Sequence, residues 1–171
     1  MIDIFGRLGD PERIRQIAEY DLFDPALHTA MDAIAERSAT LLEAPVSLVS
    51  IVLDISQFVL GSYGVSGWVA AAQGVPAEWA MCTHTVLAGE PYCVVDRRDD
   101  PRHTGNPFLE MTGLRSYLGV PLLGGAGHVL GAHCVIDARR RIFTDVDLAV
   151  LTDSSEQVMQ LLEGVRRSPA A

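Results

Sequence analysis

Two hydrophobic periodicities divide the chain into helical and strand-like segments. After Asp24-Pro25, a cap residue followed by a proline suited to a first helical turn, apolar positions recur at spacings of three and four. The stripe consists of Leu27, Met31, Ile34, Ser38 and Leu41. It predicts a helix over residues 25–43 that directs one face to a core and ends at Ala44-Pro45.

The last helix is predicted to begin at Thr144. Thr144 and Asp147 have the spacing of a capping box, with aspartate in place of the usual glutamate. The apolar stripe that follows consists of Leu148, Leu151, Ser155, Val158, Leu162 and Val165. The stripe is too short to identify a coiled coil, and a helix packed on its own sheet fits it equally well.

Between these helices, short runs rich in β-branched and apolar residues predict strands. They cover residues 46–53, 57–63, 92–95, 115–122 and 128–136. Shorter helices are expected at 11–20, 76–87 and 108–111. Because the first two strands and the last two are joined by short turns, the order favours an α+β fold with an antiparallel sheet and helices on one or both faces. We expect a single domain over 25–167, after an N-terminal extension with a short helix at 1–24 and before a tail at 168–171.

The segment from Met81 to Leu122 carries most of the candidate chemistry. A long polar excursion, punctuated by glycine and proline, separates two strand-like runs and is too long for a hairpin turn. Loops laid over a rigid sheet are where binding residues usually lie. We therefore interpret this excursion as the lid and wall of a small-molecule pocket.

Composition narrows the class of protein. The chain has 171 residues, a net charge of −9 and 49% hydrophobic residues, with apolar runs far shorter than a membrane span. No secretory signal pattern begins the sequence, so a cytoplasmic location without membrane contact is expected. Basic residues form only short runs flanked by aspartates, which argues against nucleic-acid binding.

The three cysteines and Trp68 have structural interpretations. An odd number of cysteines without a signal peptide argues against a disulfide framework. Cys93 and Cys134 lie in apolar runs and are expected to be core residues, while Cys82, near a helix start, is expected to have a lowered pKa. Trp68 is expected to anchor the glycine-bounded apolar segment 65–75 in the core.

An ordered set of short motifs resembles the GAF domain, a ligand-sensing module of signalling proteins. The matching pieces are Val46–Ser50, Cys82–His84, Val94–Asp96 with Asp100–Arg102 and Asn106-Pro107, Leu114–Leu122, Gly131–Asp137, and Phe143-Thr144 with Asp147. The resemblance covers about residues 25–165. It implies a central antiparallel sheet with the terminal helices on one face and a pocket on the other, under the 65–111 loops.

The resemblance also implies a function. The chain is expected to be a non-enzymatic sensory domain that binds a small organic ligand of unknown identity and signals to a protein partner, as a homodimer formed through its terminal helices. The candidate ligand-binding residues are Cys82, His84, Asp96, His103, Asn106, Phe108, Arg115, Tyr117 and His133. Four have simpler roles as well: Asp96 and Asn106 as caps, Arg115 as a partner of Asp96 or Asp99, and Tyr117 as a core residue with a bonded hydroxyl.

Two alternatives remain open. One branch of the family reduces free methionine sulfoxide, and Cys82 resembles one of its cysteines, although residues 104–109 lack the further cysteine of that branch. The other alternative is a ligand-free interaction module whose pocket is filled by Trp68 and Phe108. A metal site is less well supported, because the spacings of cysteine and histidine match no zinc motif. Tetrapyrrole and cyclic-nucleotide sites lack residues that these ligands require, and no feature of the sequence supports a haem site.

Overall fold

The computed structural model describes residues 3–168. Its helices are α1 (Ile4–Leu8), α2 (Pro11–Ile17), α3 (Pro25–Leu41), α4 (Gly67–Ala72), α5 (Met81–Ala88), α6 (Pro107–Thr112) and α7 (Asp145–Gly164). Its strands are β1 (Val46–Val52), β2 (Gln57–Tyr63), β3 (Tyr92–Val94), β4 (Ser116–Leu123) and β5 (Val129–Asp137). Short 3₁₀ turns cover Ala77–Trp79, Arg97–Asp99 and Pro101–His103.

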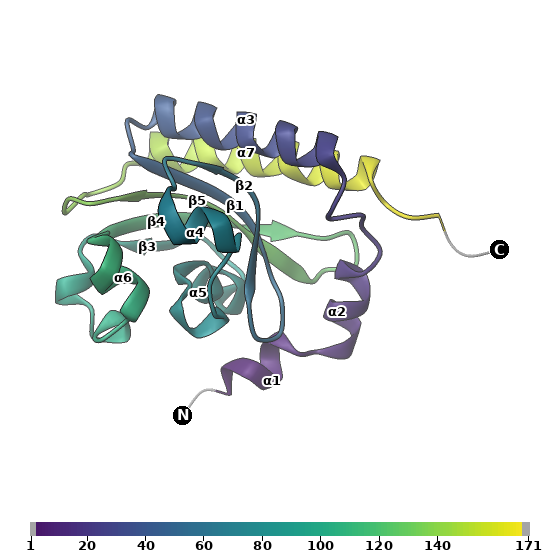
Figure 1. The fold of residues 1–171 in the computed structure, drawn as a ribbon, viewed down its shortest axis with the longest axis horizontal. Coiled ribbons are helices and arrows are strands. Elements are labelled where there is room, and N and C mark those ends of the chain that lie inside the picture. The colour runs from purple at the N-terminus through teal and green to yellow at the C-terminus, as the bar shows by residue number, and fades with distance from the viewer. Residues whose placement is uncertain (1–2, 169–171) are drawn as a thin grey trace.

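The strands form one antiparallel sheet in the order β2-β1-β5-β4-β3. The two longest helices, α3 and α7, lie side by side on one face, and α4, α5 and α6 cover the other (Figure 1). This arrangement confirms the predicted α+β class with terminal helices on one face. Gly61 lets α3 approach β2, since a Cβ atom there would meet the Met31 backbone at 2.4 Å.

Alternating side chains of the central strands supply a core to each face of the sheet. On β1, Val49 and Ile51 pack with α3 and α7, while Leu48 and Val52 join the core beneath the short helices. This alternation follows from the two-residue period of a strand. The residues that line a pocket under the short helices therefore belong to the same strands that support the terminal helices.

The N-terminal extension is fastened to the sheet by a buried arginine. Asp10 caps α2 through its side chain, which accepts hydrogen bonds from the Glu12 and Arg13 backbone. The Arg13 guanidinium donates to the carbonyls of Leu8 and Val129, each at 2.8 Å, and also reaches those of Val52 and Leu130. Buried carbonyls need such donors, so this side chain holds α1 and α2 against the ends of β1 and β5.

Four details differ from the sequence-based predictions. Helix α1 was not predicted, and its first turn is capped by Asp3. Leu41 is 61% exposed, because α3 ends there and Leu42 turns into the core instead. Cys93 is exposed because it points away from the core between Tyr92 and Val94 of the edge strand β3. Trp68 is 47% exposed, and Val69 takes the buried position of α4.

The remaining boundaries follow the predicted pattern closely. Thr144 and Asp147 form the expected capping box at the start of α7, with both hydrogen bonds present. The predicted tail lies outside the described residues from position 169 onward. Within residues 3–168, no helix has both the length and the apolar character that crossing a membrane would require.

Candidate functional site

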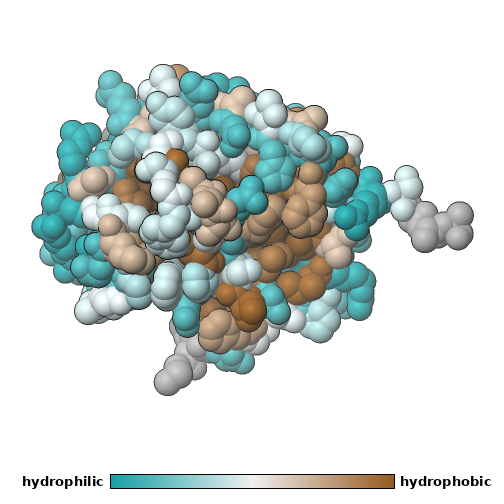
Figure 2. Space-filling model, in the orientation of Figure 1, coloured by the Kyte–Doolittle hydropathy of each residue, from teal (hydrophilic) through white to brown (hydrophobic). Residues whose placement is uncertain are grey.

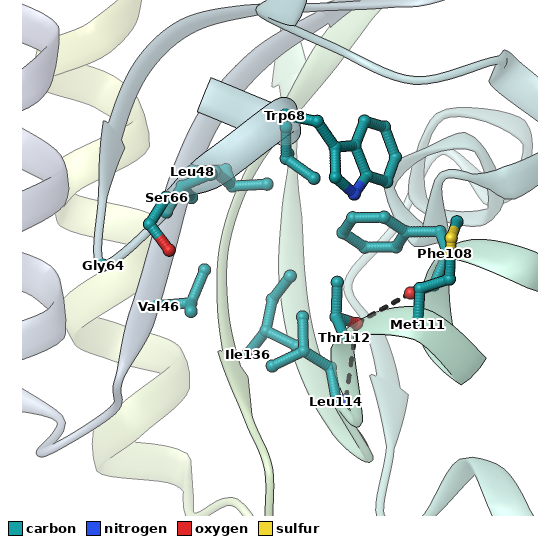
Figure 3. Close-up of a pocket in the computed structure, with 12 residues that line it drawn as sticks. Val46, Leu48, Gly64, Ser66, Trp68, Phe108, Met111, Thr112, Leu114 and Ile136 are labelled. Atoms are coloured by element: carbon teal, nitrogen blue, oxygen red, sulfur yellow. Dashed lines mark hydrogen bonds between the residues drawn. The ribbon is translucent and has the colours of Figure 1, made fainter. Parts of the chain in front are cut away.

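A cavity of about 310 Å³ lies between the sheet and the short helices (Figure 3). Strands β1 and β5 form its floor, and the segments at 64–69 and 108–114 form its walls. The lining residues are Val46, Leu48, Gly64, Val65, Ser66, Trp68, Val69, Phe108, Met111, Thr112, Leu114 and Ile136. Its location agrees with the pocket expected between the sheet and the 65–111 loops.

Helix α6 forms one wall because Asn106 fixes its start. The Asn106 Oδ1 atom accepts from the backbone N–H groups of Phe108 at 3.0 Å and Leu109 at 3.3 Å. Its Nδ2 atom donates to the Trp79 carbonyl at 3.0 Å, which ties α6 to the turn before α5. Gly113, with φ of 71°, ends the helix in the left-handed conformation that glycine adopts readily. These hydrogen bonds confirm the predicted role of Asn106 as a helix cap. They also fix the start of α6, which places Phe108 on the cavity wall.

Helix α4 forms the opposite wall and is held loosely. Two glycines have positive φ at its start, Gly64 in the preceding segment (77°) and Gly67 as its first residue (65°). Val69 is its single buried residue, and Ser66 provides no side-chain hydrogen bond to cap it. Figure 2 shows hydrophobic side chains exposed on this side of the molecule, near α4 and over the β1–β2 hairpin. A six-residue helix with one anchor and glycines at its start is suited to move as a lid.

Cys82 is the second residue of α5, and its thiol belongs to a buried polar cluster and does not line the cavity. Its Sγ atom is 3.8 Å from that of Cys134, and the side chain is 1% exposed. Hydrogen bonding with the Cys134 thiol lowers the pKa of Cys82 to about 7 against the opposing effect of burial, while burial raises the pKa of Cys134. Beside them the Tyr117 hydroxyl is bonded to Thr85 Oγ1 at 2.8 Å, which confirms its predicted core role.

His84, Tyr92 and His103 form an aromatic cluster on the outer side of α5. The His84 ring stacks on Tyr92, with centroids 5.2 Å apart, and meets the His103 ring at 4.8 Å. The Tyr92 hydroxyl forms a hydrogen bond with His103 Nε2 at 2.7 Å. Burial lowers the pKa of His103 to about 4, and its Nδ1 atom has no hydrogen-bond partner among the described residues. No third metal-binding side chain joins these histidines within residues 3–168.

Asp96 and Arg115 form a partly buried ion pair at the end of β3. The Arg115 Nε atom donates to Asp96 Oδ1 at 3.2 Å, and Arg115 Nη2 contacts the other carboxylate oxygen. Asp96 also accepts from the Arg98 backbone N–H, which confirms its predicted cap role. The hydrogen bonds from Arg115 lower the pKa of Asp96 to about 2.

His133 lies on the opposite face of the sheet, toward α3 and α7. Its Nδ1 atom donates to the Leu48 carbonyl at 2.9 Å, which leaves Nε2 to accept from the Ser38 hydroxyl at 2.8 Å. Ser38 Oγ is in turn 3.2 Å from Ser154 Oγ on α7. Burial lowers the pKa of His133 to about 4, so the imidazole is neutral at pH 7. This chain of bonds joins the cavity-lining residue Leu48 to both terminal helices.

Among the nine candidate ligand-binding residues, Phe108 lines the cavity. The other eight lie in the buried cluster, the aromatic cluster, the ion pair, the α6 cap or the helix side of the sheet; they are Cys82, His84, Asp96, His103, Asn106, Arg115, Tyr117 and His133. Sequence reasoning followed polar residues and missed the apolar lining. The signal that could have located it is segment 65–75, an apolar stretch bounded by glycines whose Trp68 lies at the cavity mouth.

Comparison with known proteins identifies the fold. The family model of the GAF domain matches residues 26–162. The chain is similar to the GAF domain of a phosphoenolpyruvate-protein phosphotransferase from Coxiella burnetii (17% identity over 90% of this chain and 92% of that one, TM-score 0.69). It is also similar to the corresponding domain from Acinetobacter (14% identity, 96% of each chain, TM-score 0.66). No curated protein matches the sequence.

An enzyme also shares the fold. The type II free methionine-R-sulfoxide reductase from Thermoplasma acidophilum is 13% identical over 82% of this chain and 95% of that one, with a TM-score of 0.66. At such identities the similarity establishes the architecture and not the chemistry. The family model, however, spans most of the chain, from residue 26 to residue 162. The chain therefore belongs to the GAF domain family, whose members are mostly sensory and regulatory domains.

Proposed function

We propose that this chain is a non-enzymatic sensory domain that binds a small organic molecule in the cavity beneath α4 and α6. The observation that supports the proposal is the cavity itself, about 310 Å³ in volume and mostly apolar, which falls in the size range of ligand sites. The exposed Trp68 side chain does not fill it, which argues against a ligand-free module with a self-filled pocket.

Ligand binding would act by ordering α4. Val69 is the single buried residue of α4, and a ligand that contacts Val69 and Trp68 would add contacts that hold α4 over the cavity. The ligand then shifts the population toward that position by its differential affinity for the two states.

The output route would run through the sheet to the terminal helices. Leu48 lines the cavity with its side chain and accepts a hydrogen bond from His133 with its carbonyl. His133 contacts Ser38 on α3, which contacts Ser154 on α7. A shift of β1 at the cavity therefore changes the bonds that hold α3 and α7.

The outer surface of α3 and α7 suits a homodimer that presents the signal to a protein partner. Leu41 is 61% exposed and Val146 is 72% exposed, and both border an open apolar groove between the helices. We expect a dimer by light scattering, and a monomer for Val146→Asp. A wild-type protein that is monomeric with and without ligand would contradict this part of the proposal.

A catalytic role for Cys82 finds little support. A reducible substrate held in the cavity would not reach this thiol, which is a buried side chain of α5 and does not line the cavity. We expect no reduction of free methionine-R-sulfoxide with a thiol reductant. Turnover that disappears in Cys82→Ser would establish the enzyme instead. The three free cysteines also suit a reducing compartment, and we propose the cytoplasm.

Thermal unfolding in the presence of a metabolite library tests the binding function. A ligand that binds the folded state raises the Tm by mass action. Ser66→Phe places an aromatic ring at the cavity mouth, and it removes no capping hydrogen bond because the Ser66 side chain makes none. This variant should abolish the ligand-induced rise in Tm. Ala71→Phe adds the same ring to an exposed position of α4 outside the cavity and should retain it. Ligands that raise the Tm of both variants equally would show that binding takes place elsewhere.

A further inference from the structure

The cavity lining contains no charged side chain. Nine of its positions carry apolar side chains, from Val, Leu, Ile, Met, Phe and Trp, and the rest are Gly64, Ser66 and Thr112. The nearest charged side chain on α6, Glu110, points to Arg97 at 2.9 Å and does not border the cavity. A charged ligand group would therefore lose its water without gaining an ionic partner.

Of the three polar side-chain groups that line the cavity, one already forms hydrogen bonds within the protein. The Thr112 hydroxyl donates to the Phe108 carbonyl at 2.8 Å and accepts from the Leu114 N–H at 3.5 Å (Figure 3). Two groups remain without a hydrogen bond to any described residue, the Ser66 hydroxyl and the indole N–H of Trp68. Figure 3 shows Ser66 just before α4 and Trp68 in the first turn of α4, both beside the cavity.

We propose that the cavity selects neutral, mainly apolar molecules that carry one hydrogen-bonding group, such as a hydroxyl or carbonyl. This inference rests on the proposed sensory function and specifies its ligand class. The apolar body of the ligand replaces water against Leu48, Ile136 and Phe108. Its polar group meets Ser66 or Trp68 at the mouth, so α4 gains contacts only when the cavity is filled.

A matched set of ligands tests charge selectivity directly. 1-Octanol, octanoate and octylammonium share one chain length and differ in charge at pH 7.5. Trp68 fluorescence reports binding in the Trp79→Phe variant, because the sequence has two tryptophans and Trp79 lies outside the cavity lining. We expect 1-octanol to bind about 100-fold more tightly than either ion, since burial of an unpaired charge is strongly unfavourable.

Variants in the same background separate the cavity from the general surface. Addition of Ser66→Phe should abolish the 1-octanol response, and addition of Ala71→Phe should leave it unchanged. Octanoate or octylammonium binding as tightly as 1-octanol would overturn the ligand class. If the octyl series fails while a charged library compound binds and is blocked by Ser66→Phe, the ligand class is wrong and the sensory function stands. If nothing binds, both fail.

Discussion

At the scale of single residues, the three cysteines differ sharply in environment. Cys93 points outward from the edge strand, whereas Cys82 and Cys134 are at most 1% exposed. Reaction with a thiol reagent requires access as well as thiolate. The lowered pKa of Cys82 therefore does not by itself make it reactive.

We expect a maleimide to label one thiol per folded chain, at Cys93, and three after denaturation in urea. Mass spectrometry of the intact protein gives the number of labels, and peptide mapping locates them. Partial burial raises the pKa of Cys93, so its labelling should be slow near pH 7 and faster at higher pH. Labelling of Cys82 at the rate of Cys93 would show that the buried cluster opens readily.

His133 should make folding stability depend on pH. Its pKa falls from 6.5 to about 4 on burial, so between these values the unfolded chain binds more protons than the folded one. The neutral imidazole contributes its full stability above pH 6.5, and this contribution is lost as the pH falls toward 4. The linkage predicts a loss of about 2 kcal/mol between pH 7.5 and 5 from this residue alone.

Urea unfolding of His133→Gln across this pH range checks the prediction. The variant should be less stable at pH 7.5, because the Leu48 and Ser38 bonds are disturbed, but its stability should fall less between pH 7.5 and 5. An unchanged slope in His133→Gln would exclude His133 as the source of the pH dependence.

At the scale of secondary-structure elements, Arg13 fixes how the N-terminal helices pack. Arg13→Met keeps most of the side-chain volume but leaves four backbone carbonyls without this donor. We expect a loss of about 3 kcal/mol in the free energy of unfolding. Arg15→Met, at an exposed position of the same helix, should cost less than about 0.5 kcal/mol. Equal stabilities of the two variants would show that the docking of α1 and α2 contributes little.

The elements with strong local signals could be predicted from the sequence. The capping box at Thr144 and the proline after Asp24 marked the starts of α7 and α3, and β-branched runs marked the central strands. Helix α1 could not be predicted, because its five residues are too few to show a periodicity and are held by contacts with α5, such as the hydrogen bond from Arg7 to the Leu87 carbonyl. The exposure of Leu41 depended on where α3 ended, which periodicity alone does not determine.

The sequence indicated where a cavity lies but not which residues line it. The pocket was expected under the 65–111 loops, and the cavity is there, but polar residues were favoured as its lining. Instead, His84 stacks on Tyr92, Asp96 pairs with Arg115 and Cys82 contacts Cys134, in three separate clusters. Side-chain direction on a short helix or loop is set by tertiary packing, so sequence alone could not separate buried partners from cavity walls.

At the scale of the whole molecule, one sheet connects two different surfaces. The cavity and α4 lie on one face, and α3 and α7 lie on the other (Figure 1). Strands β1 and β5 contribute side chains to both, through Leu48 and His133 in particular. A ligand on one face can therefore influence contacts on the other without any large movement of the domain.

The central claim is that a small molecule occupies the cavity beneath α4. Native mass spectrometry of freshly purified wild type, Ser66→Phe and Ala71→Phe, each followed by the same sample denatured, tests it most directly. We predict an additional mass on the wild type and on Ala71→Phe that disappears on denaturation, and none on Ser66→Phe. The same unliganded mass in all three proteins, or an adduct that Ser66→Phe retains, would contradict the account.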